Sequence, residues 1–258
     1  MQTSTLFTCI LTLGFSLANP LPQASSAATA CKAYTLLFAR GTGDPDLSTS
    51  AANMGSVVGP GLQTAVQNAL GANAVNVQGV NYPADASGIT AELSGSGPGS
   101  VAMTQLATTA LASCPQTRII LGGYSQGGEV VHNTVTQLKT QESNIVAVVT
   151  FGDPFKGSKL TGVDSTKWRS FCGSGDSVCG TGTCAASSCA SASTSGHLGY
   201  GSDVTTAATF IASVVGTSGN TSGAAGGGAS SPTVTTVTGS SATLAAATSS
   251  AALPWFGW

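Results

Sequence analysis

The segment RIILGGYSQGGEVVHNTV (Arg118–Val135) has a composition that few local structures can use. A short apolar run ends in two glycines, continues through Tyr-Ser-Gln and meets two more glycines before a helix-like pattern begins. Glycine is needed where the backbone bends sharply or approaches another segment closely. A strand that turns abruptly into a helix, with a serine hydroxyl exposed at the bend, needs glycine in these places. We therefore predict that Ser125 lies at such a turn and acts as a nucleophile.

Apolar runs alternate with helix-like stretches from Cys31 to about Gly216, on both sides of this turn. The predicted strands are residues 33–39, 74–83, 117–123, 144–151 and 167–172, and the predicted helices are 58–70, 100–114, 127–140 and 202–215. Such alternation indicates a parallel sheet covered by helices on both faces. In sheets of this kind the chemistry gathers at the carboxyl ends of the strands, and Ser125 falls at such an end.

A serine nucleophile needs a base to take its proton and a carboxylate to orient that base. The chain contains two histidines. His132 follows Ser125 by two turns of the same predicted helix, which places it about 10 Å away, too far to reach the hydroxyl. We interpret it as a partly buried helix residue. His197, in TSGHLGYGSD, is therefore the candidate base, and it fits the chain order serine, acid, histidine of an α/β-hydrolase.

The acid is expected between Ser125 and His197. Asp176 is favoured, because it follows a predicted strand in FCGSGDSVC, between two cysteines whose bridging would hold its loop. Asp153, in FGDPF, also follows a strand, but Asp-Pro is a common turn former, so it is the second candidate. Asp164, in TGVDST, is interpreted as an ordinary loop residue.

Acyl transfer also requires hydrogen-bond donors aimed at the negative charge that develops on the carbonyl oxygen. The backbone N–H of Gln126, directly after the nucleophile at the start of a helix, is one candidate donor. The other is expected from the loop after the first strand, FARGTGDPD, in which two glycines flank Thr42 and allow the backbone to approach a substrate.

The composition excludes some classes of partner. The chain has 258 residues, of which 41% are hydrophobic and only 7% charged, and its net charge is −2 with eight lysines and arginines. This is enough apolar material for a buried core and leaves no basic patch for nucleic acid. We predict a monomer that uses no cofactor or metal and binds no nucleic acid.

The two ends of the chain differ from its centre. Residues 1–18 read as a secretory signal, with an apolar run followed by the small-x-small pattern Ser-Leu-Ala, and the run is too short and too polar to span a membrane. Residues 19–30 are a possible propeptide. Residues 217–258 are rich in Ser, Thr, Gly and Ala and are predicted to be a flexible tail, with a glycosylation sequon at Asn220. The hydrophobic ending AALPWFGW is weaker than a lipid-anchor signal requires.

Removing the signal leaves an even number of cysteines, which in an exported chain indicates disulfides. They are Cys31, Cys114, Cys172, Cys179, Cys184 and Cys189. Zinc binding is the alternative interpretation of the last four cysteines. It is disfavoured because no CxxC pair occurs among them. The spacing alone leaves the connectivity open.

Taken together, the motifs resemble the cutinase family of secreted fungal serine esterases, which also includes the acetylxylan esterases. GYSQGG is similar to the family's nucleophile motif and ARGTGD to its oxyanion loop. NYPA resembles the loop after the second strand, while CGSGDSVC and HLGYGSD resemble the acid and histidine motifs. The resemblance covers about residues 31–216.

This resemblance implies a lidless α/β-hydrolase with a small parallel sheet and a shallow, open site. It implies a nucleophile, an acid, a base and two oxyanion donors at Ser125, Asp176, His197, Thr42 and Gln126. It also implies two disulfides, Cys31–Cys114 and Cys172–Cys179. By elimination, Cys184 is then paired with Cys189.

The chain departs from the plain cutinase pattern at two places. Asp44 stands where cutinases commonly carry Glu. Between Asp176 and His197 the chain is longer than usual, and it contains the added pair Cys184 and Cys189. We expect that loop on the rim of the site, where it would influence substrate choice.

The sequence therefore predicts a secreted serine esterase that hydrolyses cutin-type aliphatic polyesters and short- to medium-chain acyl esters. Deacetylation of xylan is the enzymatic alternative, since NYPA, GYSQGGE and GDP also look like the acetylxylan esterases, which are expected to carry more cysteines. A non-catalytic, wall-associated protein on an esterase scaffold is a further alternative. It is disfavoured because no predicted catalytic position is substituted.

Overall fold

The computed structural model describes residues 31–46, 52–179 and 194–219. By its internal contacts the chain divides into two units, residues 1–221 and 222–258, and the second unit lies entirely outside the described residues. The same is true of the predicted signal, the predicted propeptide and most of the predicted tail. Cys184, Cys189 and Asn220 also lie outside the described residues.

Five parallel strands form one sheet in the order β2-β1-β3-β4-β5. They are β1 (Tyr34–Ala39), β2 (Val75–Gly79), β3 (Arg118–Tyr124), β4 (Ile145–Phe151) and β5 (Trp168–Phe171). β3 is central, and every residue after Arg118 in it is buried. This explains its unbroken apolar run, since a parallel strand covered on both faces has no solvent side.

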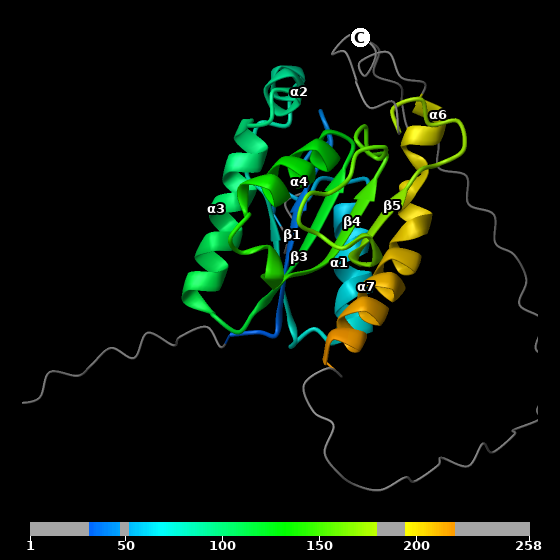
Figure 1. Cartoon of the computed structure of the whole chain (residues 1–258). Helices are drawn as coiled ribbons and strands as arrows, with labels where there is room; N and C mark the ends of the chain where they lie inside the picture. The colour runs from blue at the N-terminus through cyan, green and yellow to red at the C-terminus, as the bar shows by residue number, and fades with distance from the viewer. Residues whose placement is uncertain (1–30, 47–51, 180–193, 220–258) are drawn as a thin grey trace, which may run out of the picture. The chain divides into compact units, whose positions relative to one another are not determined.

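Helices cover both faces of the sheet, as Figure 1 shows. On one face lie α1 (Gly59–Leu70) and α7 (Val204–Gly219), and on the other lie α3 (Pro98–Ser113) and α4 (Gln126–Gln137). In β1, Leu36 and Phe38 point into the core with α1 and α7, whereas Leu37 and Ala39 point into the core with α3 and α4. Successive side chains of a strand point to opposite faces, so one strand supplies both cores. The α/β-hydrolase class predicted from the sequence is confirmed.

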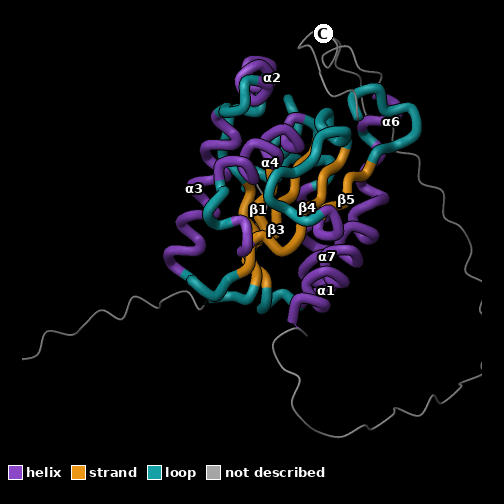
Figure 2. Tube along the Cα trace, in the orientation of Figure 1, coloured by secondary structure: helices purple, strands orange, loops and turns teal. Residues whose placement is uncertain are grey.

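The remaining elements are short. α2 (Ala86–Leu93) packs on α3 and α4, and α6 (Thr194–His197) ends at the candidate base. Three 3-10 turns, Glu142–Asn144, Ser165–Lys167 and Gly199–Asp203, complete the described elements, and Figure 2 shows the sheet enclosed by helices. Across the described part of the chain, no helix has the length and apolar character needed to cross a membrane.

The predicted elements are present, but some of their bounds differ. β2 was expected over 74–83 and is present over Val75–Gly79, because its pairing with β1 ends where Gly79 lies opposite Phe38. α7 continues to Gly219, three residues beyond the predicted domain boundary. α2 and α6 were not predicted. Both are too short for a helical periodicity to stand out from the sequence.

The two disulfides implied by the resemblance are present. Cys31–Cys114 joins the first described residue to the residue that follows α3, with Cα atoms 5.5 Å apart. Cys172–Cys179 encloses the loop after β5, with Cα atoms 5.7 Å apart. These two pairings exclude Cys172 and Cys179 as zinc ligands.

Candidate active site

Ser125 occupies the sharp turn between β3 and α4. Its φ of 56° lies in the left-handed region that residues other than glycine rarely adopt. The Ser125 N–H donates to the Phe151 carbonyl at 2.9 Å, and the Ser125 carbonyl accepts from the Gly128 N–H at 2.7 Å. The strained turn is thus tied to β4 on one side and to the first turn of α4 on the other. This is the strand–turn–helix arrangement predicted from the sequence.

The glycines around Ser125 allow backbone segments to touch. A Cβ atom on Gly123 would overlap the carbonyl of Gly127, and one on Gly127 would overlap the carbonyl of Ala39. Any side chain at these two positions would therefore push α4 away from the ends of β3 and β1. The GGYSQGG pattern is explained by close packing of the turn against the carboxyl edge of the sheet.

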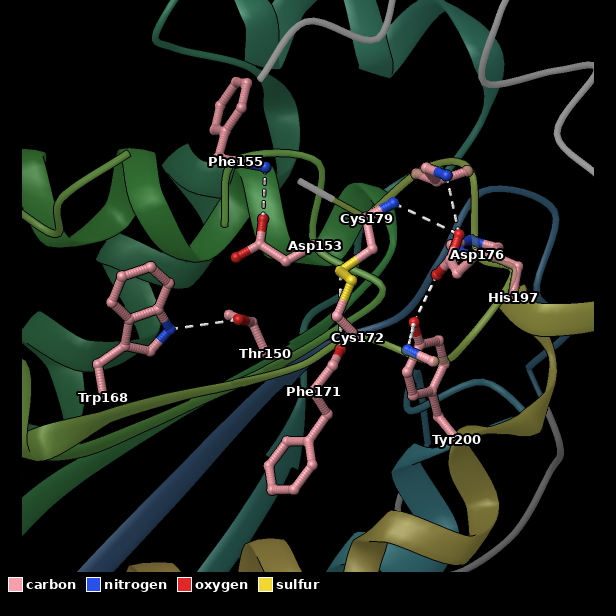
Figure 3. The surroundings of a disulfide bond; sticks show 12 residues. Thr150, Asp153, Phe155, Trp168, Phe171, Cys172, Asp176, Cys179, His197 and Tyr200 are labelled. Atoms are coloured by element: carbon pink, nitrogen blue, oxygen red, sulfur yellow. Dashed lines mark hydrogen bonds and ion pairs between the residues drawn. A yellow bond between two sulfur atoms is a disulfide. The ribbon is translucent and has the colours of Figure 1, made fainter. Parts of the chain in front are cut away.

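His197 and Asp176 form a hydrogen-bonded pair, with 2.8 Å between the imidazole Nδ1 and the carboxylate Oδ2 (Figure 3). The Asp176 side chain is fully buried, while 14% of the His197 side chain is exposed. An ionised carboxylate only accepts hydrogen bonds, so the imidazole proton lies on Nδ1. The Nε2 atom then carries a free lone pair, which is the state a general base needs.

Two further groups hold the Asp176 carboxylate. The Tyr200 hydroxyl donates to Oδ2 (Figure 3), and the backbone N–H of Val178 donates to Oδ1 at 2.8 Å. Tyr200 is itself fixed, because its hydroxyl accepts from the Gly173 N–H at 2.9 Å. Burial would raise the pKa of Asp176, but these bonds and the one from His197 outweigh it and lower the pKa below its usual value. Asp176 is therefore ionised at neutral pH.

Contacts on both sides bring His197 to the Ser125 turn. The hydroxyl of Tyr124, the residue before the serine, donates to the His197 carbonyl at 2.9 Å, and the two rings lie 5.2 Å apart. On its other side the imidazole lies against Gly152, where a Cβ atom would come within 2.8 Å of the ring. Gly152 follows Phe151, whose carbonyl holds the Ser125 N–H. His197 and Ser125 therefore contact the same short segment at the end of β4.

The two candidate oxyanion donors are linked through a side chain. The Thr42 hydroxyl donates to Oε1 of Gln126 at 3.3 Å, and Nε2 of Gln126 donates to the Asp85 carbonyl at 3.1 Å. The buried Gln126 side chain thus joins the loop after β1 to the loop after β2. Thr42 is exposed, so a ligand can approach it, while its hydroxyl proton is engaged by Gln126.

Asp44 holds the loop that carries Thr42. Its side chain is buried, and its Oδ1 accepts from both the backbone N–H and the hydroxyl of Ser56, each at 2.7 Å. In the same loop the Gly43 N–H donates to the Ala84 carbonyl at 2.8 Å. Asp44 therefore braces this loop.

Asp153, the second candidate acid, pairs with the other histidine. Its Oδ2 lies 3.0 Å from Nε2 of His132, and both side chains are buried. The sequence had indicated only a turn at Asp153 and a partly buried helix residue at His132. Asp164 accepts hydrogen bonds from Thr166 in an exposed turn, as expected of an ordinary loop residue.

Three contributions to the site were missed in the sequence. They are the hydroxyls of Tyr124 and Tyr200 and the side chain of Gln126. Tyr200 lies in the HLGYGSD segment and Tyr124 precedes the nucleophile, so both were within quoted motifs. Their bonds connect segments far apart in the chain, which no local pattern reveals.

Glu129 is a buried acid one helical turn after Ser125. It is 1% exposed, and neither of its carboxyl oxygens has a hydrogen-bond partner among the described residues. Burial raises its pKa to about 8, with smaller contributions from the negative charges of Glu92 and Asp153. Glu129 is therefore protonated at neutral pH.

This protonation predicts a loss of stability in alkali. An unfolded glutamate titrates near about 4.3, so Glu129 contributes its full stabilisation below that pH, and the contribution is lost as the pH rises through about 8. Glu129→Gln cannot ionise, so the free energy of unfolding of the variant, relative to the wild type, should increase by roughly 5 kcal/mol between pH 4 and pH 9. Denaturant unfolding at both pH values measures this. If the variant and the wild type differ in free energy of unfolding by the same amount at both pH values, Glu129 is not a buried, protonated acid.

The chain is similar to known proteins over most of the residues that the structure describes. A family model described as Cutinase matches residues 30–215. "Cutinase 4" of Emericella nidulans is 43% identical over 205 residues, which cover 76% of this chain and 82% of the relative.

Solved structures agree with this match. A Trichoderma reesei cutinase in complex with a phosphonate inhibitor superposes with a TM-score of 0.60 at 39% identity, covering 72% of this chain and 77% of the other. An acetylxylan esterase superposes with a TM-score of 0.52 at 21% identity, covering 72% of this chain and all of the other. At that identity the second likeness supports the fold alone.

Proposed function

Because this chain belongs to the cutinase family, whose members are carboxylic ester hydrolases, we propose that it is a secreted serine esterase acting on aliphatic polyesters of the cutin type and on short- to medium-chain acyl esters. The observation that carries the proposal is the hydrogen bond between His197 and Asp176 beside the turn that holds Ser125. The predicted signal segment and the two described disulfides support secretion.

The proposed reaction is acyl transfer through a covalent intermediate. The Ser125 oxygen attacks the ester carbonyl while its proton passes to Nε2 of His197, and Asp176 stabilises the imidazolium that forms. The carbonyl oxygen gains a negative charge, which Thr42 and the Gln126 N–H stabilise. The bond to the alcohol then breaks, and the alcohol leaves with the proton from His197. Water, activated by the same histidine, releases the acid and regenerates Ser125.

The test of esterase activity is hydrolysis of p-nitrophenyl butyrate with and without a phosphonate. A phosphonate is the appropriate probe because the similar Trichoderma reesei protein was solved with such an inhibitor. We expect turnover in the absence of the phosphonate. We expect complete loss of turnover once one equivalent of the phosphonate has reacted with Ser125. Folded protein without turnover would contradict the proposal and favour the non-catalytic alternative.

The substrate class requires a second comparison. Release of hydroxy fatty acids from cutin, measured against release of acetic acid from acetylated xylan under the same conditions, separates the two esters. The proposal predicts faster release from cutin. Faster release of acetic acid from acetylated xylan would identify an acetylxylan esterase with the same catalytic residues.

A further inference from the structure

The buried pair His132–Asp153 has no part in the proposed acyl transfer, yet Asp153 belongs to the turn that both Ser125 and His197 contact. We propose that this pair is a positioning device for the catalytic centre. It fixes the turn after β4, and through that turn it sets the place of the His197 imidazole and of the Ser125 backbone. This inference rests on the proposed function of Ser125 and His197.

Three consecutive residues transmit the effect. The Phe151 carbonyl accepts the Ser125 N–H at 2.9 Å. Gly152, at φ 56°, lies so close to the imidazole that a Cβ atom there would be 2.8 Å from Cε1 and 2.9 Å from Nδ1 of His197. Asp153 comes next. A movement of this turn would therefore shift the nucleophile and the base relative to each other.

The Asp153 carboxylate is held at both oxygens. Its Oδ2 lies 3.0 Å from Nε2 of His132, and its Oδ1 accepts the Phe155 N–H at 2.8 Å. The carboxylate is fully buried, so it depends on these donors in place of water. Removing the donor of His132 would leave one buried oxygen unpaired, and the turn would have to move to satisfy it.

His132 is itself rigidly placed, and it belongs to the nucleophile helix α4. Its ring meets Phe155 and Trp168 edge-on, with centroids 5.5 Å and 5.4 Å away. The carboxylate also lies directly against the first turn of α4, since a Cβ atom on Gly128 would come within 2.8 Å of it. The pair thus joins the helix that begins after Ser125 to the turn that supports His197.

Misplacement of the reacting groups lowers the rate of the chemical step more than it lowers substrate binding. A displacement of about 1 Å can reduce the rate roughly a hundredfold. Loss of the pair should therefore lower kcat and leave KM nearly unchanged, because His132 and Asp153 are buried away from any substrate. A purely structural role would lower the melting temperature without this change in kcat.

The test compares two substitutions of one residue. His132→Leu removes the donor and keeps an apolar side chain, whereas His132→Gln retains an N–H donor near the position of Nε2. With p-nitrophenyl butyrate we expect His132→Leu to lower kcat by roughly tenfold to a hundredfold, with KM within about twofold of the wild type. His132→Gln should recover most of the kcat.

Proton NMR provides a readout that does not depend on turnover. The chain has two histidines, and the described structure pairs each with a carboxylate. Each hydrogen-bonded ring N–H should give a separate downfield resonance, and His132→Gln should leave only that of His197, unchanged from the wild type. In His132→Leu the His197 resonance should shift or broaden, because the imidazole has lost its fixed support.

Several outcomes would overturn the inference. One is a folded His132→Leu variant with the kcat and the His197 resonance of the wild type, and another is equal impairment of the Leu and Gln variants. If His132→Leu does not fold, Gly128→Ala replaces it, since its methyl group presses on the Asp153 carboxylate while His132 stays in place. Wild-type kcat in that variant would also overturn the inference. A wild-type protein without turnover would contradict the proposed function instead, and the His197 resonance would still decide whether the pair positions the imidazole.

Discussion

Replacing Ser125 or His197 by alanine should lower kcat by roughly 10⁴- to 10⁶-fold while the fold persists. Without the serine no acyl intermediate forms, and without the imidazole nothing takes the serine proton. Because the two act as a unit, the double variant should be little worse than either single one. Hydrolysis of p-nitrophenyl butyrate at saturating substrate gives kcat, and circular dichroism with a thermal melt verifies the fold.

Ser202→Ala is the matched control for Ser125→Ala. Ser202 is exposed, and its hydroxyl donates to the nearby Gly199 carbonyl. Its loss should leave kcat close to that of the wild type. Substantial turnover by Ser125→Ala, or additive losses in the Ser125 and His197 variants, would rule out a shared nucleophile–base mechanism.

Asp176→Asn should lower kcat by roughly 10³- to 10⁴-fold with KM little changed. The Asp176 carboxylate accepts the Nδ1 proton of His197, whereas an amide can present an N–H to that atom and favour the tautomer whose Nε2 is protonated. A protonated Nε2 cannot take the serine proton. Steady-state kinetics separates the loss in kcat from any change in KM.

Two other aspartates serve as controls for this assignment. Asp164→Asn changes an exposed turn and should be neutral in kcat. Asp153→Asn should lower kcat less than Asp176→Asn does, because Asp153 acts through the turn and not on the base. If Asp153→Asn were the more damaging substitution, the acid of the triad would have been assigned to the wrong carboxylate.

The architecture could be predicted from the sequence wherever burial dictates composition. β3 and β4 are covered on both faces, so they carry continuous apolar runs that are visible without a structure. α2 has eight residues and begins at the Asp85 cap, and no extended periodicity marks it. The end of β2 depends on where its pairing with β1 stops, which is a tertiary property.

The candidate site, like the fold, could be predicted from the sequence only in part. Ser125 and His197 could be proposed as candidates because a glycine-framed serine is a local pattern and eligible histidines are few. The bond between His132 and Asp153 could not, since it joins a helix to a turn through burial. The sequence around Asp153 indicates a turn, but it does not show that Asp153 lies next to His132 in space.

The Cys31–Cys114 disulfide closes one part of the chain into a covalent ring and leaves the part after Cys114 outside that ring. The closed ring contains Thr42 and the elements from β1 to α3, while Ser125, Asp176 and His197 all follow it. A single protease cut inside the ring releases no fragment from the oxidised protein, whereas a cut between Cys114 and Cys172 yields two chains that neither described disulfide joins. The segment that carries Thr42 thus remains attached to the candidate catalytic residues after one cleavage within the ring, for as long as the protein is kept from reductants.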